Sequence, residues 1–221
     1  MEKKFNPEKF KLVGLALEDF NKAIKEKDVF VREARLIPVH KVGNELALAS
    51  VFLASLKYVK EYREKFFRAI KFKKSSQLFF YTEVHFSHRD YQSSRLDGLI
   101  ISVSKGIIKD AVIIEFKGKG GNVDPVQIDQ YLALNKSTYK VDKLVSVSPE
   151  YVPDIDHLPY TPIKKYKAVQ LYHFSWSRLK NIASLLLFQN GDNIEDEDQV
   201  NILSEVMHYL ESDTNGLRGF S

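Results

Sequence analysis

The segment Ala111–Lys117, with the sequence AVIIEFK, decides how the rest of the chain is interpreted. Its first four residues are apolar and mostly β-branched, a composition that predicts a buried β-strand. Side chains alternate between the two faces of a strand, so Glu115 and Lys117 are expected on the same face. Burying an acid and a base at the end of an apolar strand costs free energy unless the two groups have a use. The segment therefore predicts a functional strand end, although a simple ion pair would also explain it.

A second segment, Asp97–Val103, precedes it with the sequence DGLIISV and predicts another strand. Ser104-Lys105-Gly106 then predicts a turn that leads back along the first strand. This hairpin would bring the Asp97 carboxylate beside Glu115. Two carboxylates and a lysine at one point are the groups that hold a divalent cation and orient a water molecule. Asp97-Gly98 alone is also a common turn pair, so it predicts little by itself.

A helix is expected after the polar, glycine-rich residues 118–122. Asp124 is a suitable N-cap, and Pro125 suits the first helical position. Gln127 and Tyr131 are four residues apart and therefore share one face within the first two turns. The helix would begin near the Glu115–Lys117 strand end and direct both side chains toward it. For Tyr131 alone, packing in the core is the commoner role.

The order Asp97, then Glu115-x-Lys117, then Gln127-x-x-x-Tyr131 resembles the PD-(D/E)XK nuclease superfamily, within it the branch with a RecB-type Gln-x-x-x-Tyr motif. The resemblance covers roughly residues 44–149. It implies an α/β fold with a restriction-endonuclease-like core, in which a helix, three strands, a helix and a strand form a mixed central sheet flanked by helices.

The resemblance also implies roles for the residues that carry it. Asp97 and Glu115 would be metal ligands, and Lys117 would orient or activate the attacking water. Gln127 and Tyr131 would support the site or the scissile phosphate. Leu96 stands where the superfamily name has proline, a position that varies widely within the family.

The superfamily usually has a further acid on its first core helix. Asn44-Glu45 opens a helical pattern in which Glu45 lies on the apolar stripe, so Glu45 would reach the metal directly or through a water; the stripe consists of Leu48, Phe52, Leu56 and Val59. Equally, Asn44 caps this helix and Glu45 complements its macrodipole. Glu83, in a predicted strand over residues 79–86, is the other candidate for the additional acid.

Together with the resemblance, these residues predict a metal-dependent nuclease, which the resemblance implies hydrolyses phosphodiester bonds of DNA in restriction, repair, recombination or defence. Mg²⁺ is the expected cofactor, with Mn²⁺ able to substitute, and its expected ligands are Asp97, Glu115, the backbone carbonyl of Phe116, and Glu45. The alternative is a catalytically silent subunit that binds nucleic acid or a protein partner. Cutting both strands often requires two sites, so a homodimer is plausible.

Composition agrees with this prediction. The chain has 221 residues, 44% of them hydrophobic, a formal charge of +4 and a pI near 9.0. This size and composition support a substantial core, and the mild basicity suits a phosphate backbone. The absence of cysteine excludes disulfides and thiolate zinc sites. No signal peptide and no membrane-spanning run are evident, which predicts a cytoplasmic location.

The flanks are expected to complete a single domain over residues 1–221. Residues 1–43 predict a helical extension, with one amphipathic helix from Asn6-Pro7 to Ile24. Basic and aromatic residues alternate over Lys57–Lys74 and predict a long helix with a solvated face, or secondarily a wall of a nucleic-acid groove. After a fourth core strand at residues 141–147, a proline-rich loop leads to a strand at 168–174, a helix capped by Ser175 and a helix over about 195–210.

Overall fold

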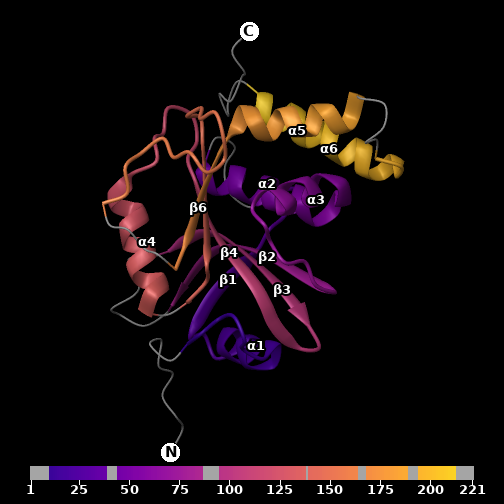
Figure 1. The fold of residues 1–221 in the computed structure, drawn as a ribbon. Helices are drawn as coiled ribbons and strands as arrows, with labels where there is room; N and C mark the ends of the chain where they lie inside the picture. Colours follow the sequence, from indigo (N-terminus) through magenta and orange to yellow (C-terminus); the bar gives the residue numbers. More distant parts are fainter. Residues whose placement is uncertain are drawn as a thin grey trace, which may run out of the picture.

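The computed structural model describes residues 10–38, 44–86, 95–137, 139–163, 168–188 and 194–212. They form an α/β fold in which helices flank a six-stranded, mixed, open sheet (Figure 1). The strands lie in the sheet in the order in which they occur in the chain. They are β1 (Val29–Glu33), β2 (Gln77–Phe86), β3 (Leu96–Ser104), β4 (Ile107–Phe116), β5 (Lys143–Ser148) and β6 (Gln170–Ser175).

The sheet changes its pairing pattern at β4. From β1 to β4 all neighbours are antiparallel, whereas β5 runs parallel to β4 and β6 runs parallel to β5. The predicted hairpin is therefore present as β3–β4, and its turn contains Lys105 and Gly106 with φ of 51° and 72°. A left-handed conformation at two successive residues is typical of tight hairpin turns.

Helices cover both faces of the sheet and enclose two apolar cores (Figure 1). One core joins the sheet to α2 (Glu45–Tyr58), α3 (Lys60–Ala69), α5 (Trp176–Phe188) and α6 (Glu197–Glu211). The other joins the opposite face to α1 (Leu17–Lys25) and α4 (Pro125–Ser137). Alternate residues of β4 serve the two cores, with Ile114 in the first and Ile113 in the second. A strand buried on both faces explains the unbroken apolar run that begins at Ala111.

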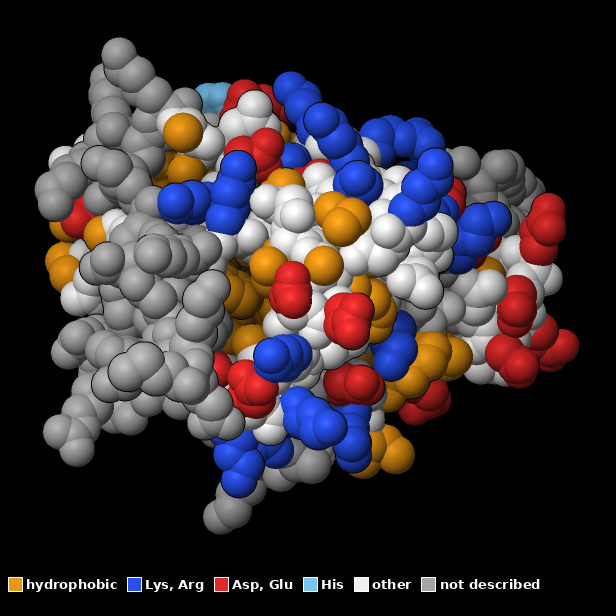
Figure 2. Space-filling view, turned by 90° about the horizontal axis from the view of Figure 1, so that it is seen from below, with side chains coloured by type: hydrophobic (Ala, Val, Ile, Leu, Met, Phe, Trp, Pro, Cys, Tyr) orange, Lys and Arg blue, Asp and Glu red, His pale blue; other side chains and the backbone are white. Residues whose placement is uncertain are grey.

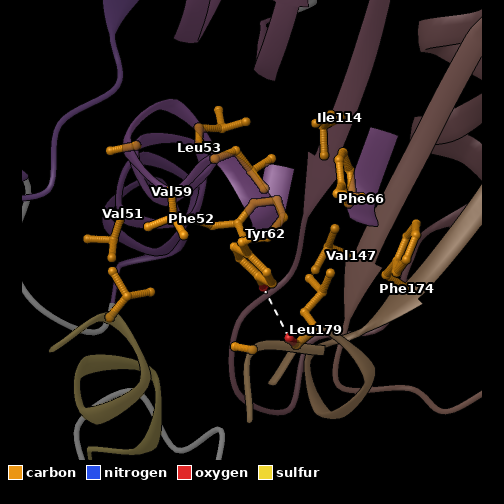
Figure 3. Packing of buried hydrophobic residues seen from close by; sticks show 14 of the residues in the cluster. Val51, Phe52, Leu53, Val59, Tyr62, Phe66, Ile114, Val147, Phe174 and Leu179 are labelled. Atoms are coloured by element: carbon orange, nitrogen blue, oxygen red, sulfur yellow. Dashed lines mark hydrogen bonds between the residues drawn. The ribbon is translucent and has the colours of Figure 1, made fainter. Parts of the chain in front are cut away.

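Phe52 lies at the centre of the first core (Figure 3). Its ring makes edge contacts with Tyr62, Phe66, Phe116 and Trp176, at centroid distances of 6.2, 5.6, 5.8 and 5.9 Å. Each fully buried large apolar side chain contributes about 1.5–3 kcal/mol to stability. The Tyr62 hydroxyl also donates a 3.1 Å hydrogen bond to the carbonyl of Leu179, which links α3 to α5. This packing holds α2 and α5 against the strand end that carries the predicted site.

The N-terminal prediction is wrong in two respects. The helix α1 begins only at Leu17, because the preceding chain pairs with the β3–β4 hairpin: Gly14 donates to the carbonyl of Ile108, and Leu17 donates to that of Gly106. Gly14 has a φ of 95°, a conformation that interrupts a helix. The region also contains β1, which extends the sheet. The predicted start at Asn6-Pro7 lies outside the described residues.

The long helix predicted over Lys57–Lys74 is instead split. The helical conformation is interrupted at Val59, which is extended with a φ of −103° and a ψ of 104°, so α2 ends before it and α3 begins after it. The break turns Tyr62, Phe66 and Phe67 into the core while Lys60 stays exposed. The predicted solvated face is therefore present, but on a shorter helix.

The C-terminal predictions are confirmed closely. β6 lies within one or two residues of the strand expected at 168–174, and Ser175 Oγ accepts a 3.1 Å hydrogen bond from the Arg178 amide at the start of α5. Asp196 caps α6 by accepting from the Gln199 amide at 3.2 Å. Within the described ranges, none of the helices has the length and apolar character needed to cross a membrane.

Candidate active site

Two carboxylates meet where β3 begins and β4 ends. The ladder pairs Gly98 with Ile114, which places Asp97 opposite Glu115. The Phe116 amide donates a 3.1 Å hydrogen bond to Oδ2 of Asp97. Glu115 is fully buried and Asp97 is 9% exposed. Asp97-Gly98 is thus part of a strand and not the turn that the pair also suggested.

Gly98 allows the two strands and α2 to approach closely at this point. A Cβ atom on Gly98 would lie 3.0 Å from Cε2 of Phe116 and 3.1 Å from Cδ1 of Leu53. Both neighbours belong to the packed core, so they have little room to move. The glycine after Asp97 is therefore a packing requirement.

Lys117 follows the last residue of β4 and points back at the acids. Its Nζ lies 2.8 Å from Oε1 of Glu115, so the expected acid–base pairing is present. Its backbone is held on both sides, because its amide donates to the carbonyl of Val147 at 2.8 Å and its carbonyl accepts from Nε1 of Trp176 at 2.8 Å. The amine is thus positioned by β5 and α5 as well as by its own strand.

Gln127 and Tyr131 extend this contact into a chain of hydrogen bonds. Lys117 Nζ donates to Oε1 of Gln127 at 2.8 Å, Nε2 of Gln127 donates to the Tyr131 hydroxyl at 3.1 Å, and that hydroxyl donates to the carbonyl of Arg95 at 2.7 Å. The helix that carries them starts as predicted, since Asp124 Oδ1 accepts from the Val126 amide at 2.8 Å. Tyr131 is buried and also has a polar contact at the site.

Glu45 reaches the same strand end from the first turn of α2. Its Oε1 accepts a 3.0 Å hydrogen bond from the Gly118 amide, one residue after Lys117. Asn44 caps the helix by accepting from the Leu46 amide at 2.8 Å. The predicted cap at Asn44 is therefore confirmed, and Glu45 lies beside Lys117 and Gly118; its contact with a metal stays a prediction. Glu83, the other candidate acid, forms ion pairs with Arg32 and Arg95.

Burial controls the protonation of the acid pair. It raises the pKa of the Glu115 carboxyl to about 8, and the neighbouring Asp97 charge adds to the rise. Burial likewise raises the pKa of Asp97. Without a cation, the pair therefore holds a proton at neutral pH.

Lys117 responds to the same surroundings in the opposite sense. Burial alone would favour its neutral form, but the carboxylates of Glu115, Glu45 and Asp97 outweigh burial and raise the pKa of Lys117. The amine is therefore a cation at neutral pH and acts as a hydrogen-bond donor. It cannot serve as a resting-state base.

The donor set fits a small divalent cation. Both oxygens of the Glu115 carboxylate are buried, beside the Asp97 carboxyl and with Lys117 Nζ 2.8 Å from Oε1. A buried carboxylate oxygen left in this state is costly unless a cation or proton binds it. Carboxylate and carbonyl oxygens are the ligands that Mg²⁺ prefers. The Phe116 ring packs on Phe52 and Trp176, which leaves only its backbone carbonyl for a metal.

The Glu45 carboxylate does not form a tight group with the other two acids. Among the described residues, one group of three acids or histidines has all its ligand atoms within 4.8 Å of one another, and it consists of Asp154, Asp156 and His157. Glu45, Asp97 and Glu115 do not meet this limit in the present conformation. Glu45 would reach a cation held by Asp97 and Glu115 either directly or through a water. The Asp154 group is exposed on a loop and carries no further sign of a site.

Two residues of the site were not predicted. Trp176 donates a hydrogen bond to the carbonyl of Lys117, 59 residues earlier in the chain. The carbonyl of Arg95 accepts a hydrogen bond from the hydroxyl of Tyr131, 36 residues later. Trp176 is the single tryptophan of the chain and directly follows the strand that ends at Ser175, which is the one signal the sequence offers. A backbone acceptor such as Arg95 leaves no signal in the side-chain pattern.

Comparison of the chain with protein-family models, with curated proteins and with solved structures found no match in any of the three. The function is therefore inferred from the residues and their geometry.

Proposed function

We propose that the protein is a metal-dependent nuclease that hydrolyses phosphodiester bonds of DNA. The observation that carries the proposal is the convergence of Asp97, Glu115 and Lys117 at one buried strand end, with Lys117 Nζ 2.8 Å from Glu115. The element order gives further support. Apart from the additional α3, the series α2, β2–β4, α4, β5 is the order expected of a PD-(D/E)XK core.

The acids are proposed to hold the metal. Asp97, Glu115 and the Phe116 carbonyl would hold it, and Glu45 would contact it through a water. When bound, Mg²⁺ would supply Lewis-acid chemistry, activating a water and the phosphate for hydrolysis. Because Lys117 is a cation, it orients the attacking water and stabilises the negative charge that develops on the phosphate.

The surrounding residues are proposed to position Lys117. Gln127 contacts its amine, Tyr131 holds Gln127, and Trp176 holds its carbonyl. A lysine side chain has several rotatable bonds, so fixing both its head and its backbone limits the geometries available to the amine. Correct placement of reacting groups is worth large factors in rate.

Charge is mixed on the face of the molecule seen from below. Figure 2 shows basic and acidic side chains interleaved over this face, with basic side chains gathered along one margin. The homodimer and the biological setting stay predictions.

Cleavage of supercoiled and linear DNA in Mg²⁺, Mn²⁺ or EDTA tests the proposal. We expect cutting in both metals, none in EDTA, and none by Glu115→Ala. Asp154→Ala is the matched control, because it removes an exposed acid from the other acidic group and should cut normally. Normal cutting by Glu115→Ala would overturn the proposal. Binding without cutting in any metal would favour the catalytically silent alternative.

A further inference from the structure

Two arginines converge on one buried acid close to the proposed site. Nε of Arg32 lies 2.6 Å from Oε2 of Glu83, and Nη1 of Arg95 lies 3.4 Å from Oε1 of the same carboxylate. The Glu83 side chain is 10% exposed, whereas those of Arg32 and Arg95 are 40% and 46% exposed. The carboxylate thus anchors two guanidinium groups that still face solvent, and the three charges sum to a net positive charge.

A β-bulge directs Glu83 toward these arginines. β1 and β2 pair Phe30 with His85 and Arg32 with Thr82, so Val31 faces two residues of β2, Glu83 and Val84. Glu83 has a φ of 53°, a left-handed conformation that is unfavourable for a residue with a side chain. Bulges of this kind redirect side chains and are common beside functional sites.

Glu83, which holds the two arginines, lies on the strand next to that of Asp97. β2 and β3 pair Thr82 with Gly98 and Val84 with Leu96, which places Glu83 opposite Asp97. Arg95 is two residues before Asp97, and its carbonyl accepts the Tyr131 hydroxyl. Because β1 to β4 are antiparallel, the start of β1, the end of β2 and the start of β3 lie at the same end of the sheet as Glu115.

An aromatic pair adjoins the arginines on the edge strand. The rings of Phe30 and His85 stack with centroids 4.9 Å apart and planes 29° apart. Phe30 is nevertheless 39% exposed, and Cζ of Arg32 lies 6.0 Å from its ring centroid. An exposed large aromatic residue beside exposed cations is the combination that binds unpaired nucleotides, because the bases stack on the ring and the cations hold the phosphates.

We propose that Phe30, Arg32 and Arg95 form a binding surface for single-stranded DNA that leads into the site of Asp97 and Glu115. The inference rests on the proposed nuclease function and names its substrate class: a single strand, or the unpaired end of a duplex. The arginines bind the phosphates next to the one that is cut, since a guanidinium pairs with phosphate oxygens through two hydrogen bonds. Phe30 stacks on a base and gives the preference for unpaired DNA.

Fluorescence anisotropy in EDTA tests this surface without cleavage. The probe is a labelled oligothymidylate of about 15 nucleotides, compared with a duplex of the same length. We expect the wild type to bind the single strand more tightly. Phe30→Ala and Arg95→Ala should each weaken its binding about fivefold or more, and Arg32→Ala should act like Arg95→Ala. Phe30→Trp keeps a stacking surface and should bind as the wild type does.

The salt dependence of binding measures the phosphate contacts of the two arginines in a second way. Each phosphate contact that is lost should reduce the slope of log affinity against log salt by about 0.7 for a single strand. Lys109→Ala is the matched control, because this exposed cation lies toward the opposite end of β4 and should change neither affinity nor slope.

The outcomes separate this inference from the proposed function. If the wild type cuts DNA while Phe30→Ala, Arg32→Ala and Arg95→Ala bind the single strand normally, the inferred binding surface is wrong and the proposed nuclease function stands. If the wild type binds through these residues but never cuts, the inferred binding surface stands and the proposed nuclease function is wrong. A wild type that prefers duplex DNA would also overturn the inference.

Discussion

Nε1 of Trp176 donates a 2.8 Å hydrogen bond to the carbonyl of Lys117, so the first residue of α5 fixes the residue that supplies the proposed catalytic amine. The Trp176 ring also stacks on Phe116 at 6.0 Å, directly before Lys117. One side chain thus contributes to both the core and the site, and replacing it by phenylalanine separates the two contributions.

Trp176→Phe should lower both the rate of DNA cleavage and the stability of the fold. Loss of the hydrogen bond leaves the Lys117 carbonyl unpaired and should cost about 1–3 kcal/mol in the free energy of unfolding. The freed backbone should cost about 10- to 100-fold in cleavage rate through misplacement of the amine. Urea denaturation and single-turnover cleavage measure the two effects.

Tyr62→Phe is the control for this substitution. It removes another buried donor, the hydroxyl that bonds to the Leu179 carbonyl in the same core, but it leaves Lys117 untouched. We expect a similar loss of stability with an unchanged cleavage rate. Equal cleavage by Trp176→Phe and Tyr62→Phe would show that Trp176 has no role at the site.

Asp97→Asn should abolish cleavage and leave the fold intact. The amide oxygen can still accept from the Phe116 amide, so the strand pairing is retained. Removing one of two adjacent buried acids relieves their repulsion, and the free energy of unfolding above pH 7 should rise by about 1 kcal/mol. Cleavage assays, and urea denaturation near the raised pKa of Glu115 of about 8, provide the test, and cleavage by the folded variant would remove Asp97 from the metal site.

Stability of the metal-free protein should fall as the pH rises from about 4.5 toward 8. The pKa of Glu115 is raised to about 8 in the folded state and is near its ordinary value when unfolded. Between these values the folded state holds a proton that the unfolded state has released, so stability decreases with pH, and it levels off above the folded pKa. Asp97, whose pKa is also raised, acts in the same direction.

Urea denaturation in EDTA across this pH range measures the effect. Glu115→Gln cannot ionise at this position, so its stability should depend less steeply on pH than that of the wild type. Parallel curves for the two proteins would show that Glu115 has an ordinary pKa.

Mg²⁺ binding should release protons at neutral pH. The acid pair holds a proton when no metal is bound, and a cation displaces it because carboxylate ligands bind in the ionised form. Calorimetric titration in buffers of different ionisation enthalpy measures the number released. We expect a value between zero and one for the wild type, no binding by Glu115→Gln, and unchanged binding by Asp154→Ala. Binding that survives in Glu115→Gln would place the metal elsewhere.

Tyr131→Phe should lower kcat without raising KM. The substitution removes the acceptor for Gln127 and the donor to the Arg95 carbonyl, but retains the ring in the core. Lys117 keeps its charge and loses part of its support, so the expected loss is about tenfold in kcat. Steady-state cleavage kinetics measure the two constants; a change in KM alone would assign Tyr131 to substrate binding.

Local patterns predicted the parts of the molecule that depend on neighbouring residues. The apolar run at Ala111, the turn at Lys105-Gly106 and the cap at Asp124 each form a local structure, and each is present. The meeting of Asp97 with Glu115 followed from one hairpin. The nuclease assignment itself remains a prediction.

Contacts between distant segments were not predictable in the same way. β1 is a five-residue strand of mixed polarity, and its sequence VFVRE does not distinguish an edge strand from a loop. The apolar spacing from Phe10 to Ile24 suits a helix, but backbone pairing with the hairpin decides the first half of that segment. The ion pair of Arg32 with Glu83 joins residues 51 apart, and no periodicity indicates it.

β4 pairs on one side with a strand that is adjacent in sequence, β3, and on the other side with a strand that is distant in sequence, β5. β3 and β4 are joined by a tight turn, whereas β5 and α5 reach β4 only after long crossovers. During synthesis, Asp97 and Glu115 can therefore meet well before Val147 and Trp176 emerge to hold Lys117. A chain interrupted before α5 would contain both acids but would lack the Trp176 hydrogen bond to Lys117, and the proposed nuclease activity would reach its full rate only after α5 has been made.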